Sequence, residues 1–98
     1  MLKEFQNIHF VGIGGIGMSG LARILLSQGK SVSGSDLKSN TQTEELTAAG
    51  ATIFQNHAPE NLPPDTDYLV VSTAISANNP EYQAAQERNI PIIHRSEV

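Results

Sequence analysis

Residues 12–17 (GIGGIG) have the glycine spacing of a phosphate-binding turn. They match G-x-G-x-x-G and lie between an apolar run, Ile8–Val11, and a stretch with helical periodicity, 18–26. In this pattern the first glycine allows a tight turn, the second lets the backbone approach a phosphate, and the last allows the helix to pack closely on the strand. The helix N-terminus would then face the anion. The alternative interpretation is a tight strand-to-helix turn without a ligand.

One carboxylate, Asp36, follows the next extended segment, 31–35, at a position typical of a ribose-binding acid. It lies 24 residues after Gly12 and 19 after Gly17, near the spacing of the acid that accepts hydrogen bonds from ribose hydroxyls. Aspartate also favours turns and helix caps, so a purely structural role is the alternative.

The three histidines do not suggest a metal site, and the chain has no cysteine. His9 falls inside the first strand and is interpreted as a packed or edge residue, with a ligand contact as the alternative. His57 follows the third strand, where contact with a nucleotide and stabilisation of the loop are both open. His94 follows the fifth strand, where it can simply begin a linker. No serine lies in a nucleophile-elbow sequence, so we predict no catalytic residue and no metal ligand in this chain.

The composition and the missing motifs narrow the function to binding. No G-x-x-x-x-G-K-[ST] occurs, so the chain cannot complete phosphoryl transfer. The net charge is −4 and the six basic residues are scattered, so we expect no nucleic-acid partner. The sequence contains no signal-peptide core and no apolar run long enough for a membrane span, so we expect no membrane contact and a cytoplasmic location.

The chain alternates between extended and helical segments, which predicts a single α/β domain over residues 1–98. We expect a Rossmann-like fold: a five-stranded parallel sheet in the order 3-2-1-4-5, with helices on both faces and the ligand beside the glycine turn. The expected strands are 8–11, 31–35, 51–54, 68–71 and 90–93, and the expected helices are 18–26, 42–49 and 80–88, with at most one turn near 58–62.

Local signals predict where the helices begin and end. Thr41 and Glu44 have the spacing of a capping box for the second helix. Asn79 followed by Pro80 is typical of the start of a helix. Gly50 and Asn89 are expected to end the second and third helices.

Residues 9–22 (HFVGIGGIGMSGLA) resemble the amino-terminal opening of the bacterial UDP-N-acetylmuramate–L-alanine ligases, which are members of the Mur ligase family. The stretches 33–36, 70–75 and 79–81 agree with it, and the related murein-peptide ligases share the glycine-rich opening. The resemblance implies a three-domain enzyme of peptidoglycan precursor synthesis. Its first domain holds UDP-N-acetylmuramate, its central domain binds ATP and Mg²⁺, and its third receives L-alanine, whose amine attacks an acyl phosphate.

This chain would then be the N-terminal domain, inactive alone and without a cofactor of its own, with the central and C-terminal domains as its partners in the bacterial cytoplasm. The resemblance assigns diphosphate contacts to Gly14, Gly15, Ile16, Gly17 and Met18, and uridine contacts to Asp36 and Leu37. It also assigns a substrate contact to His57 and places Arg95 near the sugar-phosphate end. The opposite wall of the site would be formed by Ser72, Thr73, Ala74 and Ile75. The main rival is an NAD-binding domain of a dehydrogenase or regulator, which fits the spacing equally well. A structural interaction domain would leave the glycines unexplained.

Overall fold

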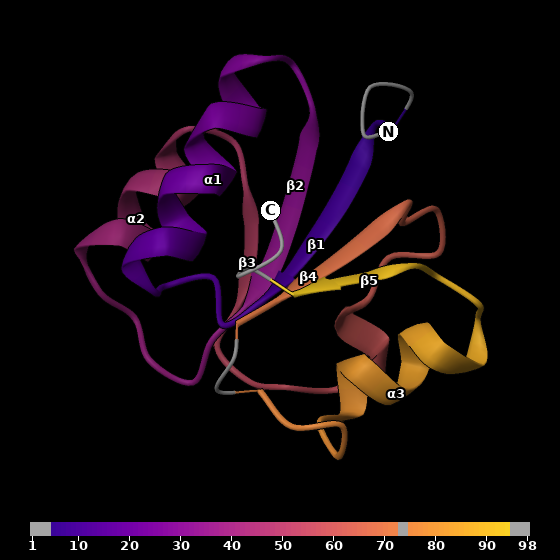
Figure 1. Cartoon of the computed structure of the whole chain (residues 1–98). Helices are drawn as coiled ribbons and strands as arrows, with labels where there is room; N and C mark the ends of the chain where they lie inside the picture. The colour runs from indigo at the N-terminus through magenta and orange to yellow at the C-terminus, as the bar shows by residue number, and fades with distance from the viewer. Residues whose placement is uncertain (1–4, 73–74, 95–98) are drawn as a thin grey trace.

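Five parallel strands form the centre of the structure, a computed structural model that describes residues 5–72 and 75–94. The strands are β1 (Asn7–Val11), β2 (Ser31–Ser35), β3 (Thr52–Phe54), β4 (Tyr68–Val71) and β5 (Ile92–His94). Their order in the sheet is β3-β2-β1-β4-β5, as the alternating sequence pattern predicts (Figure 1). The strand order therefore reverses beside β1, where ligands bind in sheets of this kind.

Helices cover both faces of the sheet (Figure 1). They are α1 (Ile16–Ser27), α2 (Thr41–Ala48), the 3-10 helix η1 (Pro59–Asn61) and α3 (Pro80–Glu87). Helices α1 and α2 pack together on one face, and η1 and α3 pack together on the other. The predicted arrangement is confirmed.

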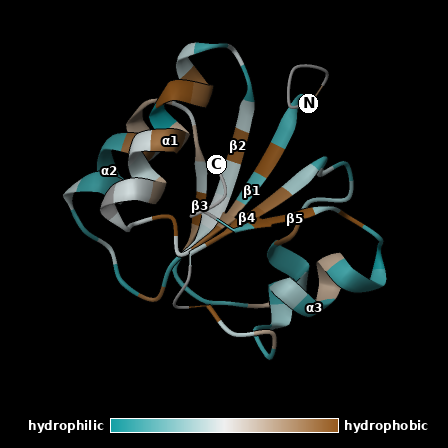
Figure 2. Ribbon diagram, viewed as in Figure 1, coloured by the Kyte–Doolittle hydropathy of each residue, from teal (hydrophilic) through white to brown (hydrophobic). Residues whose placement is uncertain are grey.

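Each face of the sheet has its own apolar cluster, because neighbouring residues of a strand point to opposite faces. Phe10 and Val70 belong to the larger cluster, together with Met18, Ala22 and Leu25 of α1. Leu69, Val71, Ala84 and Ala85 belong to the smaller cluster on the α3 face. Hydrophobic residues alternate with polar ones along β1, and hydrophilic residues predominate in α2 and α3 (Figure 2).

Helix α1 begins two residues earlier and ends one residue later than expected, and α2 is shifted by one residue at each end. The N-cap of α2 is Asn40, whose side chain accepts from the Thr43 N–H at 2.9 Å, while the Thr43 hydroxyl accepts from the Asn40 N–H at 2.9 Å. The predicted capping box from Thr41 to Glu44 is therefore wrong by one residue, because asparagine and threonine form the same reciprocal pair as serine and glutamate do.

The remaining limits agree closely with the prediction. Asn79 caps α3, Pro80 is its first residue, and Asn89 ends it with a φ of 59°. Strand β5 begins two residues later than expected, after Pro91, which has no N–H to donate to the neighbouring strand. None of the helices within the described residues is long and apolar enough to cross a lipid bilayer.

Candidate functional site

The carboxyl ends of the strands lie side by side, so the segments that follow them meet at one edge of the sheet. Val11 pairs with Ser35 on one side and with Val71 on the other. Ser35 pairs in turn with Phe54. The chain therefore leaves β1, β2, β3 and β4 at the same level, in the lower middle of Figure 1. This register places the glycine turn between the ends of β2 and β4.

The glycine turn is fixed by the backbone of β2. The Ser35 carbonyl accepts hydrogen bonds from the N–H groups of Gly12 at 2.8 Å and Ile13 at 3.0 Å. Gly12 has a φ of +85°, which a residue with a side chain rarely adopts, so its predicted role in a tight turn is confirmed.

Asp36 anchors the second glycine of the motif. Its Oδ2 accepts from the Gly14 N–H at 2.9 Å, and its Oδ1 accepts from the Lys38 N–H at 3.2 Å. A Cβ atom on Gly14 would lie 2.9 Å from Asp36 Oδ2, 3.1 Å from Asn40 Nδ2 and 3.2 Å from Thr43 Cγ2. The close approach that requires glycine here is thus made by Asp36 and the start of α2, a reason that the motif alone does not reveal.

Helix α1 directs its N-terminus toward the same edge. The Ser19 N–H donates to the Gly15 carbonyl at 2.8 Å, so the N–H groups of residues 16–18 precede this first helical bond. Gly15 and Gly17 are exposed, whereas the Met18 side chain is buried in the core, so Met18 could offer a ligand only its backbone. Exposed Gly17 does not provide the predicted close packing of helix on strand; the buried Met18 and Ala22 side chains do so instead.

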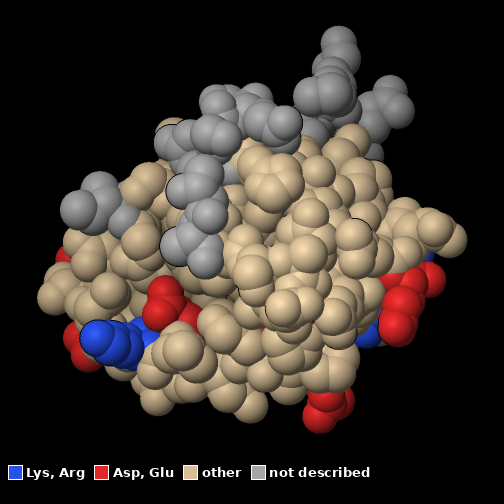
Figure 3. Space-filling view, turned by 60° about the horizontal axis from the view of Figure 1, so that its bottom comes forward, with Lys and Arg blue, Asp and Glu red and all other residues tan. Residues whose placement is uncertain are grey.

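Ser72 and Ile75 form the opposite side of the turn. A Cβ on Gly12 would lie 3.5 Å from Ser72 Oγ and 3.9 Å from two Ile75 side-chain atoms. Leu37 is 68% exposed beyond Asp36. The other predicted wall residues, Thr73 and Ala74, and the predicted Arg95 lie outside the described residues. Figure 3 shows the molecule turned so that the carboxyl ends of the strands come forward. Among the described residues, most of this surface is uncharged, and basic and acidic side chains lie mainly toward its margins.

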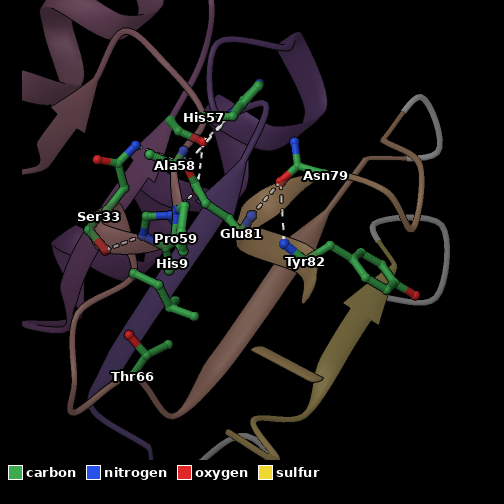
Figure 4. A network of polar contacts seen from close by, with 12 residues as sticks. His9, Ser33, His57, Ala58, Pro59, Thr66, Asn79, Glu81 and Tyr82 are labelled. Atoms are coloured by element: carbon green, nitrogen blue, oxygen red, sulfur yellow. Dashed lines mark hydrogen bonds and ion pairs between the residues drawn. The ribbon is translucent and has the colours of Figure 1, made fainter. Parts of the chain in front are cut away.

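Behind this edge lies a buried carboxylate, Glu81, in the first turn of α3. Its Oε1 accepts from His9 Nε2 at 2.6 Å and from the Ser35 hydroxyl at 2.8 Å. Its Oε2 accepts from Asn61 Nδ2 at 2.9 Å and from the Ala58 N–H at 3.1 Å. Figure 4 shows this carboxylate between β1, η1 and α3. Glu81 therefore links α3 to three other elements, β1, β2 and η1.

The pKa of Glu81 lies below its ordinary value. Burial opposes the charged form, but the hydrogen bonds from His9, Asn61 and Ser35 and the positive field of His9 outweigh burial. The four donors occupy both oxygens, so Glu81 keeps little capacity to act as a base. Ser33, which contacts His9 Nδ1 at 2.7 Å, completes a set with the composition of a hydrolase triad. Since Ser33, His9 and Glu81 are all buried, no substrate can reach them.

His57 connects the buried network to the edge of the sheet. Its Nδ1 lies 2.8 Å from the Ser35 hydroxyl and 3.8 Å from Glu81 Oε2, and its side chain is 15% exposed. The structure thus supports the loop-stabilising interpretation of His57, and its remaining exposure leaves ligand contact a prediction. His9, fully buried, is the packed residue that was expected.

Sequence reasoning missed Glu81, which looks like an ordinary first-turn acid of α3. A signal was nevertheless present. His9, Ser33 and Ser35 place polar groups on one face of strands that should be buried on both faces. Such groups require a buried partner.

An open groove of about 220 Å³ lies elsewhere, between β2, β3 and the loop 63–66. Its lining includes Asn7, Ser31 and Thr52 at the amino ends of the strands and Phe54 at the carboxyl end of β3, but no residue of the glycine turn. The glycine turn, and not this groove, therefore defines the candidate site.

Comparison with known proteins agrees with this geometry. The model of the Mur ligase family, catalytic domain, matches residues 7–98. The UDP-N-acetylmuramate-alanine ligase of Thermotoga maritima is 39% identical, with a TM-score of 0.87 over 92% of this chain and 21% of that one. The UDP-N-acetylmuramate:L-alanyl-gamma-D-glutamyl-meso-diaminopimelate ligase of Neisseria meningitides is 28% identical, with a TM-score of 0.82 over 93% of this chain and 29% of that one.

A murein peptide ligase of Psychrobacter arcticus is 27% identical, with a TM-score of 0.82 over 89% of this chain and 18% of that one. The chain thus spans between about a fifth and three tenths of the length of these proteins.

Proposed function

The chain belongs to the Mur ligase family, and on this premise we propose that it is the N-terminal domain of an ATP-dependent ligase that adds L-alanine to UDP-N-acetylmuramate. Its task is to hold the UDP part of that substrate for peptidoglycan precursor synthesis. The observation that carries the proposal is the glycine turn, which opens α1 at the point where the strand order reverses. Identity of 39% to an alanine ligase, against 27% and 28% to two murein-peptide ligases, supports L-alanine as the amino acid.

The diphosphate belongs at the N-terminus of α1. The positive end of the α1 helix dipole favours an anion there. The first turn of α1 carries no acidic side chain that would repel the phosphates.

The nucleoside belongs beside Asp36, because a carboxylate repels phosphate and accepts from hydroxyl or imide groups. Each Asp36 oxygen accepts one backbone N–H, and a carboxylate has about four acceptor positions. Asp36 can therefore hold the glycine turn and a ribose or uracil donor together. In our proposal Leu37 and His57 also border the nucleoside, and Ser72 and Ile75, which lie beside Gly12, form its opposite wall.

Our proposal assigns neither ATP nor Mg²⁺ to this chain. The sequence has no lysine-containing P-loop, and within the described residues no group of three or more metal-binding side chains could hold a metal ion. In our proposal both belong to other domains of the full-length ligase, as does the chemical step.

The proposal is tested by titrating the 98-residue chain with UDP, UDP-N-acetylmuramate and NAD. We expect calorimetry to detect both UDP compounds and not NAD. Amide NMR shifts should concentrate at residues 14–18 and at Asp36. Inorganic pyrophosphate should shift the α1 amides and leave Asp36 unchanged. Binding of NAD without a response to UDP would overturn the proposal in favour of a dinucleotide-binding domain.

A further inference from the structure

The hydrogen bonds around Ser35 can have only one direction. The hydroxyl carries a single hydrogen, yet its oxygen lies 2.8 Å from Glu81 Oε1 and 2.8 Å from His57 Nδ1. An ionised carboxylate only accepts, so the Ser35 hydrogen must go to Glu81. The reverse arrangement would leave two oxygens 2.8 Å apart without a hydrogen between them.

His57 must therefore donate to Ser35 through Nδ1–H. A neutral imidazole carries one hydrogen, so its Nε2 then holds a lone pair. No hydrogen bond to Nε2 occurs among the described residues, and the His57 side chain is 15% exposed. His9 and His57 lie on different sides of the Glu81 carboxylate, so His57 is the histidine that can reach a ligand (Figure 4).

We propose that Glu81, acting through the Ser35 hydroxyl, is a positioning residue that fixes His57 as the Nδ1–H tautomer and presents Nε2 as an acceptor to a donor group of the nucleoside. This rests on the proposed function, and it adds the chemistry of recognition. A neutral acceptor selects an O–H or N–H group, such as a ribose hydroxyl or the uracil imide. The neutral Nε2 does not attract phosphate, which agrees with our proposal that the diphosphate binds at the N-terminus of α1.

Ser35 also connects this relay, the hydrogen bonds from His57 through the Ser35 hydroxyl to Glu81, to the glycine turn. Its carbonyl holds the N–H groups of Gly12 and Ile13, while its hydroxyl holds His57. The acceptor atom and the turn are thus set by the same residue of β2. The Glu81 carboxylate is well suited to this role, because four donors and complete burial leave it in one orientation.

The test compares Ser35→Ala with Ser33→Ala. Both serines are buried on the same face of β2, but the Ser33 hydroxyl contacts His9 and not His57. The first readout is the tautomer of His57, measured without ligand from long-range ¹⁵N–¹H ring correlations at alkaline pH. We expect Nδ1–H in the parent chain and in Ser33→Ala, and a shift toward Nε2–H in Ser35→Ala. Backbone amide spectra of each variant establish that it is folded.

The second readout is the affinity for UDP. Loss of one oriented neutral hydrogen bond predicts a roughly two- to tenfold weaker affinity in Ser35→Ala and no change in Ser33→Ala. An Nε2–H tautomer in the parent chain, or an unchanged tautomer in Ser35→Ala, would overturn the relay. A shifted tautomer with unchanged UDP affinity would overturn the role in recognition. If UDP does not bind at all, the proposed function fails, and the tautomer still decides the relay.

Discussion

At the scale of single residues, Ser35 and Asp36 explain the glycine turn better than its glycines do. These neighbours at the end of β2 bind three consecutive N–H groups of the turn, those of Gly12, Ile13 and Gly14. A glycine motif is usually interpreted by what a ligand requires. Here the nearest atoms to a side chain at position 14 belong to the protein itself. The turn is therefore held by hydrogen bonds within the protein, which reduces the ordering cost of binding.

A pair of glycine substitutions tests this explanation. Gly14→Ala should destabilise the chain by about 1–3 kcal/mol, because its methyl group would press on the hydrogen-bonded carboxylate of Asp36 and on α2. Gly20→Ala, inside α1 with no atom within 4 Å of the new Cβ, should stabilise it by about 0.5–1 kcal/mol. Urea unfolding of both variants measures the two effects. Equal stability of Gly14→Ala and the parent chain would contradict the explanation.

At the scale of elements, α2 is short and weakly amphipathic, so its first turn decides much of its stability. Asn40 caps the helix and also donates from Nδ2 to the Gly14 carbonyl at 3.3 Å. Together with Asp36 it ties α2 to the glycine turn. The turn is thus supported from β2 and from α2, and α1 begins from a fixed position.

Asn40 and its neighbour Thr41 offer a matched test of the cap. Asn40→Ala should lower the free energy of unfolding by about 1–2 kcal/mol, since the Thr43 N–H and the Gly14 carbonyl both lose their partner. Thr41→Ala should change it by less than about 0.5 kcal/mol, because Thr41 is exposed and does not form the cap. Thermal unfolding distinguishes them; a larger loss at Thr41 would restore the capping box that the sequence suggests.

At the scale of the whole molecule, one face of the sheet is filled by apolar side chains and the other combines an apolar cluster with a charged network. The Glu81 carboxylate joins α3 and η1 to β1 and β2. The buried apolar residues of α3, Ala84 and Ala85, belong to the smaller cluster. A buried charge of this kind is costly when any of its partners is removed. The α3 half of the molecule therefore depends on the ionised state of Glu81.

This dependence predicts acid sensitivity. The pKa of Glu81 is lowered in the folded chain, and the pKa of Asp67 is lowered by hydrogen bonds from the N–H groups of Gln6 and Asn7. Below the ordinary glutamate value of 4.5 the unfolded chain binds more protons than the folded one, so stability is complete above that pH and declines as pH falls further. Urea unfolding between neutral and acidic pH should show this decline.

A control on the same helix isolates the contribution of Glu81. Glu81→Gln should be less stable at neutral pH and lose less on acidification, because it no longer carries the titrating group. Glu87→Gln, at an exposed position of α3, should follow the parent chain at every pH. Parallel acid profiles for the parent chain and Glu81→Gln would show that Glu81 does not contribute.

The sequence by itself determined the strand order, the glycine turn, the end of β2 at Ser35 and the cap of α3 at Asn79. The glycine turn and the cap depend on local chemistry, namely backbone freedom at glycine and hydrogen bonds between near neighbours, and the strand order follows from the alternation of strands and helices. Only the tertiary structure decided the partners of Glu81 and His57, and the reason why Gly14 must be glycine. His9 and Glu81 are 72 residues apart, and Ser35 and His57 are 22 apart. Contacts of such range arise from the register of the strands and the packing of α3, which no local pattern of residues records.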